Sequence, residues 1–187
     1  MANSFEKRPS AFERPLAITD VETTGLDWTR HEIIDIGLLV VDQNTLAVRE
    51  EFEIRVRPAK IETADPVSLR IAGYNEEEWT GAVPLVEAMR QYGNKVKNAL
   101  FLAHPLTVDF SFIDAAFRKT GVENPLHYHQ LDLFSMAWVL LKEEEHLPTV
   151  TLHELTKFFE LDPEPTPHRA IGGARLALEI LKKLRSL

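Results

Sequence analysis

The stretch ITDVETTGL, residues 18–26, decides how the rest of the chain is interpreted. It begins like a buried strand, yet it carries two carboxylates, Asp20 and Glu22, two positions apart. In a strand, positions i and i+2 project from the same face, about 6.5 to 7 Å apart, so the two acids lie side by side. Like charges on one half-buried surface repel each other and lose hydration. The pair therefore indicates a site to which something cationic comes.

The bulk composition predicts one globular domain. The chain has 187 residues, 44% of them hydrophobic, which is enough apolar material for one ordinary core. Residues 1–15 mix charges with proline and lack an apolar run, so we expect a mobile lead-in before a single domain at residues 16–187. The absence of cysteine excludes disulfides, thiol catalysis and thiolate-held zinc, and fits a reducing, cytoplasmic setting. No run approaches the length of a membrane span, so no membrane partner is expected.

The formal net charge of −8 bears on nucleic-acid binding. Long nucleic-acid grooves use many lysines and arginines to neutralise phosphates, so an acidic chain argues against one. A small footprint stays compatible with this charge. If carboxylates hold divalent metals, the metals supply the positive field, and the negative net charge no longer argues against nucleic-acid binding.

The hydrophobic pattern predicts strands first, and then strands that alternate with helices. Strands are expected at 16–20, 32–41, 46–56, 98–104 and 129–131, the first three forming a meander. Helices are expected at 66–73, 84–96, 110–117, 134–141, 151–159 and 169–185. This order predicts a mixed sheet with helices on its faces.

Other polar residues have ordinary interpretations when each is taken alone. Asp109 lies between an apolar run and a helix, where an acid is stabilised by the helix dipole. His168 stands just before the last helix, after the loop DPEPTP, as a surface histidine would. His127 and His129 form a His-x-His pair with no third ligand at useful spacing, which is typical of strand-edge residues.

The residues become specific only in combination. The chain contains, in order, ITDVETTGLD, HEIIDIG, LAHPLTVDFSFIDAAF, LDLFSMA, TLHELTKFF and HRAIGGARLALEIL. This series resembles the DEDD superfamily of 3′-to-5′ exonucleases in its histidine-bearing branch, which includes the proofreading subunit of bacterial DNA polymerase III, ribonuclease T and oligoribonuclease. The resemblance covers nearly the whole chain after residue 15. It implies an α/β, ribonuclease H-like fold with a five-stranded mixed sheet flanked by helices.

The resemblance also implies two Mg²⁺ or Mn²⁺ ions and hydrolysis of the terminal phosphodiester. Asp20 would bridge both metals, Glu22 would ligate the metal that holds the attacking water, and Asp109 would serve the second metal. Carboxylate oxygens suit such hard cations, and two metals about 3.5 to 4 Å apart stabilise both the entering and the leaving oxygen. His168 would be the general base, since an imidazole with a pKa near 6.5 is suited to deprotonating water.

The partners implied are the 3′ end of single-stranded DNA or RNA and, since several branches of the family pair as dimers, a second copy of the chain or a polymerase. Thr23, Thr24 and Leu26 would meet the 3′-terminal nucleotide through backbone N–H groups and one apolar contact. Arg169 and Arg175 flank the last motif, where they either touch phosphate or are simply solvated.

The chain departs from the family pattern in two motifs. The last motif of the family runs His-x-Ala-x-x-Asp-Ala, and here Gly173 takes the place of the acid. Pro105 and Val108 replace the usual Asn and Phe of the second motif. A Gly-Gly pair inside a helix costs about 1 kcal/mol per Gly relative to Ala, so it is expected to loosen the first turns.

The missing acid changes the charge count. Three carboxylates give −3 against +4 for two dications, so we hypothesise that the second metal enters mainly with substrate, whose phosphodiester contributes −1. Asp162 and Glu164, in the loop before the last helix, are candidate substitutes, whereas Glu179 lies nearly two turns past the position and is too distant.

Three functions follow from this sequence. The first is a metal-dependent 3′-to-5′ exonuclease acting on single-stranded nucleic acid, with activity reduced by the absent acid. The alternative is a catalytically degenerate module that binds a nucleic-acid end or a protein partner. The third is a ribonuclease H-like scaffold with a different metal reaction.

Overall fold

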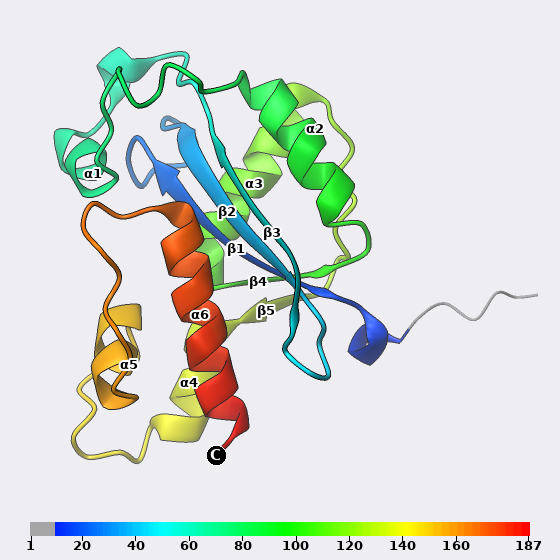
Figure 1. The fold of residues 1–187 in the computed structure, drawn as a ribbon, viewed down its shortest axis with the longest axis vertical. Coiled ribbons are helices and arrows are strands. Elements are labelled where there is room, and N and C mark those ends of the chain that lie inside the picture. Colours follow the sequence, from blue (N-terminus) through cyan, green and yellow to red (C-terminus); the bar gives the residue numbers. More distant parts are fainter. Residues whose placement is uncertain (1–9) are drawn as a thin grey trace, which may run out of the picture.

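A single five-stranded mixed sheet organises the computed structural model, which describes residues 10–187 (Figure 1). The strands are β1 (Leu16–Thr23), β2 (Ile33–Val41), β3 (Val48–Arg55), β4 (Leu100–Ala103) and β5 (Gln130–Asp132). Their order across the sheet is β3-β2-β1-β4-β5. The first three strands form an antiparallel meander, whereas β4 runs parallel to β1 and β5 runs parallel to β4. The predicted five-stranded mixed sheet and its meander are confirmed.

Within the part of the chain that the structure describes, six α-helices connect and cover the strands. They are α1 (Pro66–Ile71), α2 (Leu85–Lys95), α3 (Leu106–Thr120), α4 (Leu133–Leu141), α5 (Leu152–Phe158) and α6 (Ala170–Arg185), with short 3-10 turns at Ala11–Glu13 and Ile61–Thr63. The expected helices are present, but α3 begins at Leu106 rather than at Phe110. Pro105 holds extended backbone at the N-cap, and the Leu106 N–H donates to Asp132 Oδ1 at 3.0 Å, so the helix starts one turn earlier.

Alternation along β1 divides the core between the two faces of the sheet. Leu16 and Ile18 pack with the side chains of α4, α5 and α6, whereas Ala17 packs with those of α2 and α3. Figure 1 shows α6 crossing one face of the sheet and α2 and α3 covering the opposite face. Because side chains alternate with period two, the same pattern places Asp20 and Glu22 on the face that α6 covers.

The first turn of α6 lies directly on the backbone of β2. Gly37 pairs with Asp20 across the sheet, and a Cβ at Gly37 would lie 2.1 Å from the carbonyl carbon of Ala170. The fully buried Asp35 accepts the Ala170 N–H through Oδ2 at 3.3 Å. Arg169, the N-cap residue, supplies no side-chain cap, so Asp35 satisfies this helix terminus from the neighbouring strand. The start of α6 is thereby fixed beside Asp20.

The segment before β1 is partly tied to the sheet. The carbonyl of Ala11 accepts from Gln43 Nε2 at 3.0 Å, and the carbonyl of Pro15 accepts from the Leu100 N–H at 2.9 Å. The expected boundary at residue 15 therefore falls within chain that is bonded to the sheet, and residues 1–9 of the expected mobile lead-in lie outside the described residues. Within residues 10–187, no helix combines the length and the apolar character needed to cross a membrane.

The close approach at Gly37 predicts the effect of a single methyl group. In Gly37→Ala, the new Cβ collides with the backbone of Ala170, so we expect the free energy of unfolding to fall by about 1 to 3 kcal/mol. Urea denaturation measures this change. The matched control is Gly81→Ala, because no atom lies within 4 Å of a Cβ built there. Equal stabilities of the two variants would contradict the described packing.

Candidate active site

Three acids meet where β1 extends beyond β4. The pairing of β1 with β4 ends at Ile18, so the following edge of β1 is open. There, the Val21 N–H donates to Oδ1 of Asp109 at 3.0 Å. Asp109 lies in the first turn of α3 and is 4% exposed. The structure therefore brings Asp109 to the strand segment that carries Asp20 and Glu22.

His168 is held by the loop that precedes α6. The backbone N–H of His168 donates to the carbonyl of Ile71, at the end of α1, at 3.0 Å. Pro167 packs so tightly on Gly73 that a Cβ at Gly73 would lie 2.4 Å from the Cβ of Pro167. Gly73 also has a φ of +61°, which glycine adopts without strain. These two contacts fix the backbone from which the imidazole projects.

Glu164 joins the predicted residues. Glu22, Glu164 and His168 each offer one potential ligand atom, and these atoms lie within 4.8 Å of one another. His168 Nδ1 is 3.5 Å from Glu164 Oε2. Asp162, the other candidate substitute, is exposed in the same loop. The site thus gathers the four predicted residues together with one further carboxylate.

Gly173 lets α6 pack against Asp20 and does not disrupt the first turns of the helix. A Cβ at this position would lie 2.5 Å from Oδ2 of Asp20, so the glycine lets the helix lie against that carboxylate. The Gly173 N–H donates to the carbonyl of Arg169 at 3.2 Å, and α6 is helical from Ala170 onward. The expected loosening of the first turns is absent from the structure, because packing on β1 and β2 outweighs the low helix propensity of glycine.

Burial and mutual repulsion raise the pKa values of these acids. Burial is the largest cause of the raised pKa of Asp20, followed by the charges of Asp109 and Glu22. Burial, followed by the charges of Glu164 and Asp35, raises the pKa of Glu22 to about 7. The pKa of Asp109 is raised by burial, although the hydrogen bond from Val21 opposes this. Burial likewise raises the pKa of Glu164.

This donor set fits a hard divalent cation. Crowded carboxylates destabilise one another unless a positive charge lies between them. Carboxylate oxygens are the ligands that Mg²⁺, Mn²⁺ and Ca²⁺ prefer, and one imidazole beside them is compatible with such a site. Of the residues predicted from the sequence, Asp20, Glu22 and Asp109 would hold the cations.

The turn after β1 is largely fixed by internal hydrogen bonds. Thr23 Oγ1 donates to the Gly25 carbonyl at 2.7 Å, and Thr24 both donates its N–H to the Glu32 carbonyl and accepts the Glu32 N–H through Oγ1. Among the described residues, the N–H groups of Gly25 and Leu26 donate no hydrogen bond. Leu26 is 79% exposed. Gly25 is buried, so of the predicted substrate contacts the exposed ones are the Leu26 side chain and the Leu26 N–H.

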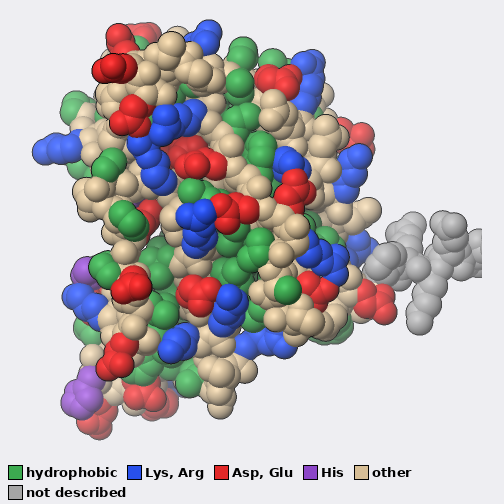
Figure 2. Space-filling view, viewed as in Figure 1, with side chains coloured by type: hydrophobic (Ala, Val, Ile, Leu, Met, Phe, Trp, Pro, Cys, Tyr) green, Lys and Arg blue, Asp and Glu red, His purple; other side chains and the backbone are tan. Residues whose placement is uncertain are grey.

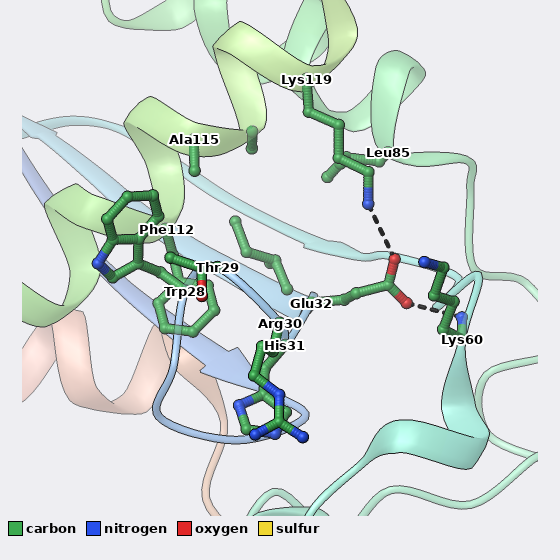
Figure 3. Close-up of a pocket in the computed structure, with 12 residues that line it drawn as sticks. Trp28, Thr29, Arg30, His31, Glu32, Lys60, Leu85, Phe112, Ala115 and Lys119 are labelled. Carbon is green, nitrogen blue, oxygen red and sulfur yellow. Dashed lines mark hydrogen bonds and ion pairs between the residues drawn. The ribbon is translucent and has the colours of Figure 1, made fainter.

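A separate cavity of about 260 Å³ lies between the loop after this turn and α3. Figure 3 shows Glu32 at its side, with Oε1 accepting from Lys119 Nζ and Oε2 accepting from the Lys60 N–H. The lining includes Trp28 and Phe112 but none of the four clustered acids Asp20, Glu22, Asp109 and Glu164. The cavity is thus distinct from the carboxylate cluster.

The two arginines beside the last motif have protein partners. Arg169 pairs with Glu78 and lies 5.3 Å from the centroid of the Trp79 ring. Arg175 pairs with Glu51, its Nε lying 3.2 Å from Oε2. Both therefore have structural roles in this conformation.

Comparison with known families identifies the chain. The model of the RNase T family, described as an exonuclease, matches residues 17–181. The chain belongs to this exonuclease family. The resemblance to DEDD exonucleases that the motifs indicate is therefore confirmed.

Curated relatives of this exonuclease family are larger proteins. The chain is 28% identical to the PolC-type DNA polymerase III of Caldanaerobacter subterraneus subsp. tengcongensis, over 94% of this chain and 12% of that protein. It is 28% identical to the 3′-5′ exonuclease DinG of Staphylococcus epidermidis, over 73% of this chain and 16% of that protein. The chain therefore spans about an eighth to a sixth of the length of these relatives.

Solved structures confirm the ribonuclease H-like fold of the family. Exonuclease I of E. coli in complex with a dA16 oligonucleotide superposes with a TM-score of 0.76 at 16% identity, over 92% of this chain and 41% of that one. The nuclease domain of 3′hExo, a DEDDh family member bound to rAMP, superposes with a TM-score of 0.73 at 16% identity, over 94% and 95% of the two chains.

The sequence motifs assign no role to Asp35, although it lies beside the site. It pairs with Glu22 across the sheet and caps α6, and burial, followed by the charge of Glu53, raises its pKa to about 7. The available signal is its position as the only charged residue in the run IIDIGLLVV of β2. An acid in such a fully buried strand requires a partner, which here is the start of a helix.

The raised pKa values predict how the stability of the metal-free protein depends on pH. A carboxyl whose pKa rises on folding binds more protons in the folded state, so stability falls as pH increases from about 4.5 through about 7. For Glu22 alone, the loss between pH 6 and pH 8 is about 1 kcal/mol. Urea unfolding in EDTA should therefore show lower stability at pH 8, and Glu22→Gln should reduce the difference by about that amount.

A matched control separates this local effect from the general effect of pH. Glu145→Gln removes an exposed acid in the segment between α4 and α5 and should leave the pH dependence unchanged. Mn²⁺ at pH 8 should restore stability, because it binds the ionised carboxylates of the folded state. Stability that increases from pH 6 to pH 8 in EDTA would contradict the electrostatics of the site.

Proposed function

We propose that the chain is a metal-dependent 3′-to-5′ exonuclease that hydrolyses the terminal phosphodiester of single-stranded nucleic acid. One observation carries the proposal: Asp20 and Glu22 of β1, Asp109 of α3 and His168 of the loop before α6 converge in a member of an exonuclease family. Each of these residues occupies the position that the DEDD pattern predicts for it.

The acids and the histidine have different tasks in this proposal. Asp20, Glu22 and Asp109 would hold two Mg²⁺ or Mn²⁺ ions, which would supply positive charge to the phosphate oxygens. His168 accepts the proton of the attacking water. Its side chain is 43% exposed, so the proton can pass on to solvent. The hydrogen bond from the backbone N–H of His168 to the Ile71 carbonyl fixes the backbone that carries this imidazole.

The surface favours a short single-stranded substrate. On the face shown in Figure 2, basic and acidic side chains are interspersed, and no continuous basic band crosses it. Together with the net charge of −8, this supports a footprint of a few nucleotides. The exposed Leu26 would pack on the terminal base, and its N–H would donate to the nucleotide.

A second candidate is a degenerate module that binds a 3′ end without cleaving it. The observation that favours it is Gly173, because the family motif has a ligand acid there. The two functions differ in one measurement, which is whether a bound oligonucleotide becomes shorter.

Stepwise shortening of a 5′-labelled single-stranded oligonucleotide in Mn²⁺ or Mg²⁺ tests the proposal. Asp20→Ala should lower the rate at least 100-fold, because it removes a metal ligand. His168→Ala should lower it by about 10² to 10⁴, which is the usual contribution of a general base. The control is His153→Ala, because that side chain is 71% exposed on α5. Binding without shortening by the unaltered protein would instead support the degenerate module.

Substitution of Leu26 tests the substrate contact separately from the chemistry. Leu26→Ala should raise KM about tenfold and leave kcat nearly unchanged, because loss of one apolar contact costs roughly 1 to 2 kcal/mol of uniform binding. Steady-state kinetics with a short oligonucleotide give both constants. Val139→Ala, on the exposed side of α4, is the control and should change neither. An unchanged KM in Leu26→Ala would exclude Leu26 from the substrate site.

A further inference from the structure

We propose that Glu164 supplies the carboxylate that the last family motif lacks, so that a loop residue completes the metal site in place of position 173. This inference rests on the proposed function. Glu164 lies nine residues before Gly173 and reaches the same cluster from the loop that carries His168. Its side chain is 12% exposed, although most of the loop is exposed.

The two glycines of α6 show how the replacement fits. A Cβ at Gly173 would lie 2.5 Å from Oδ2 of Asp20, and a Cβ at Gly172 would lie 3.0 Å from Oε1 of Glu164. Each glycine therefore touches one carboxylate of the cluster. The Gly-Gly pair removes the side chains that would keep Asp20 and Glu164 away from the helix. An aspartate at 173 would need space that the carboxylate of Asp20 already occupies.

The orientation of Glu164 matches a ligand of the ion beside Glu22. One oxygen, Oε1, accepts the Arg169 N–H at 3.3 Å, and the other, Oε2, lies 3.5 Å from His168 Nδ1. Potential ligand atoms of Glu22 and Glu164 lie within 4.8 Å of each other, where two anions repel unless a cation separates them. The resemblance to the DEDD exonucleases implies that an acid at position 173 would share the metal that Glu22 binds, so Glu164 would replace it on the same side of the site.

The charge count changes with this fourth acid. Asp20, Glu22, Asp109 and Glu164 together give −4, which balances two dications at +4 without substrate. The count of three acids predicts a second metal that needs the substrate phosphate. The inference therefore predicts that the free protein binds two ions.

Helix capping is the competing explanation for Glu164, and one substitution separates the two roles. In Glu164→Gln, the amide oxygen can still accept the Arg169 N–H, so capping is retained while the charged ligand is lost. Asp162→Asn is the matched control, because it removes the same charge from an exposed position in the same loop.

Calorimetric titration with Mn²⁺, in the absence of nucleic acid, measures the number and affinity of the sites. We expect two sites in the unaltered protein and in Asp162→Asn, and one site in Glu164→Gln, with the other weakened at least tenfold. Urea unfolding in EDTA should show that Glu164→Gln is folded and not less stable, since it relieves repulsion. A short oligonucleotide should restore the second site of Glu164→Gln.

The outcomes distinguish this inference from the proposed function. Equal Mn²⁺ binding by the unaltered protein and Glu164→Gln would overturn the role of Glu164 and leave the exonuclease proposal standing. A single site in the unaltered protein would do the same. If the unaltered protein and Asp20→Ala both bind no Mn²⁺, with or without oligonucleotide, the proposed function itself fails.

Discussion

The contact between the first turn of α6 and Gly37 is the constraint on which the site depends. Because β2 has no side chain there, the helix backbone lies on the sheet, and Asp35 caps it from the same strand. This contact sets the height of α6 above β1. Gly173 then touches Asp20, and the loop before the helix is brought over Glu22. A helix seated further from the sheet would leave the acids of β1 exposed and separate them from His168.

The acids enclosed in this way destabilise the metal-free fold. Asp20, Glu22 and Asp109 are all shifted toward the protonated form by burial and mutual repulsion, and Asp35 adds a further buried carboxyl nearby. Hydrogen bonds from the protein satisfy only part of this set, such as the one from Val21 to Asp109. Buried polar groups are normally hydrogen-bonded or paired with an opposite charge, and this cluster departs from that rule. Such departures are common where a fold maintains a functional site. A divalent cation between these carboxylates would replace their mutual repulsion with attraction to the ion. The same acids that destabilise the metal-free fold would then favour cation binding.

The sequence predicted the fold well because its hydrophobic periods agree with the tertiary structure. The all-apolar β2 had to lie inside the sheet, and the alternation of β1 placed Asp20 and Glu22 on one face. The early start of α3 was missed, because it depends on Asp132, 26 residues away. Asp35 was missed for the same reason, since its partner in α6 is 135 residues distant. Motifs record which side chains are present, whereas a cap or a neighbouring loop depends on packing that no local pattern contains.

If Glu164 replaces an acid at position 173, the metal ligand comes from a loop and not from a helix, and the loop then determines where that ligand lies. An acid at position 173 would be held by the hydrogen bonds of α6, whereas Glu164 is held by the Arg169 N–H and by the loop anchored at Ile71. The same anchor positions His168. In the proposed site, cation binding by Glu164 and the placement of His168 as the base would be coupled through one segment of the chain, because whatever orders that loop orders both groups. A rigid helix would fix the ligand without fixing the base. In this arrangement the loop must stay ordered, and the packing of Pro167 on Gly73 maintains that order. This accounts for a tight contact in a segment that is otherwise exposed.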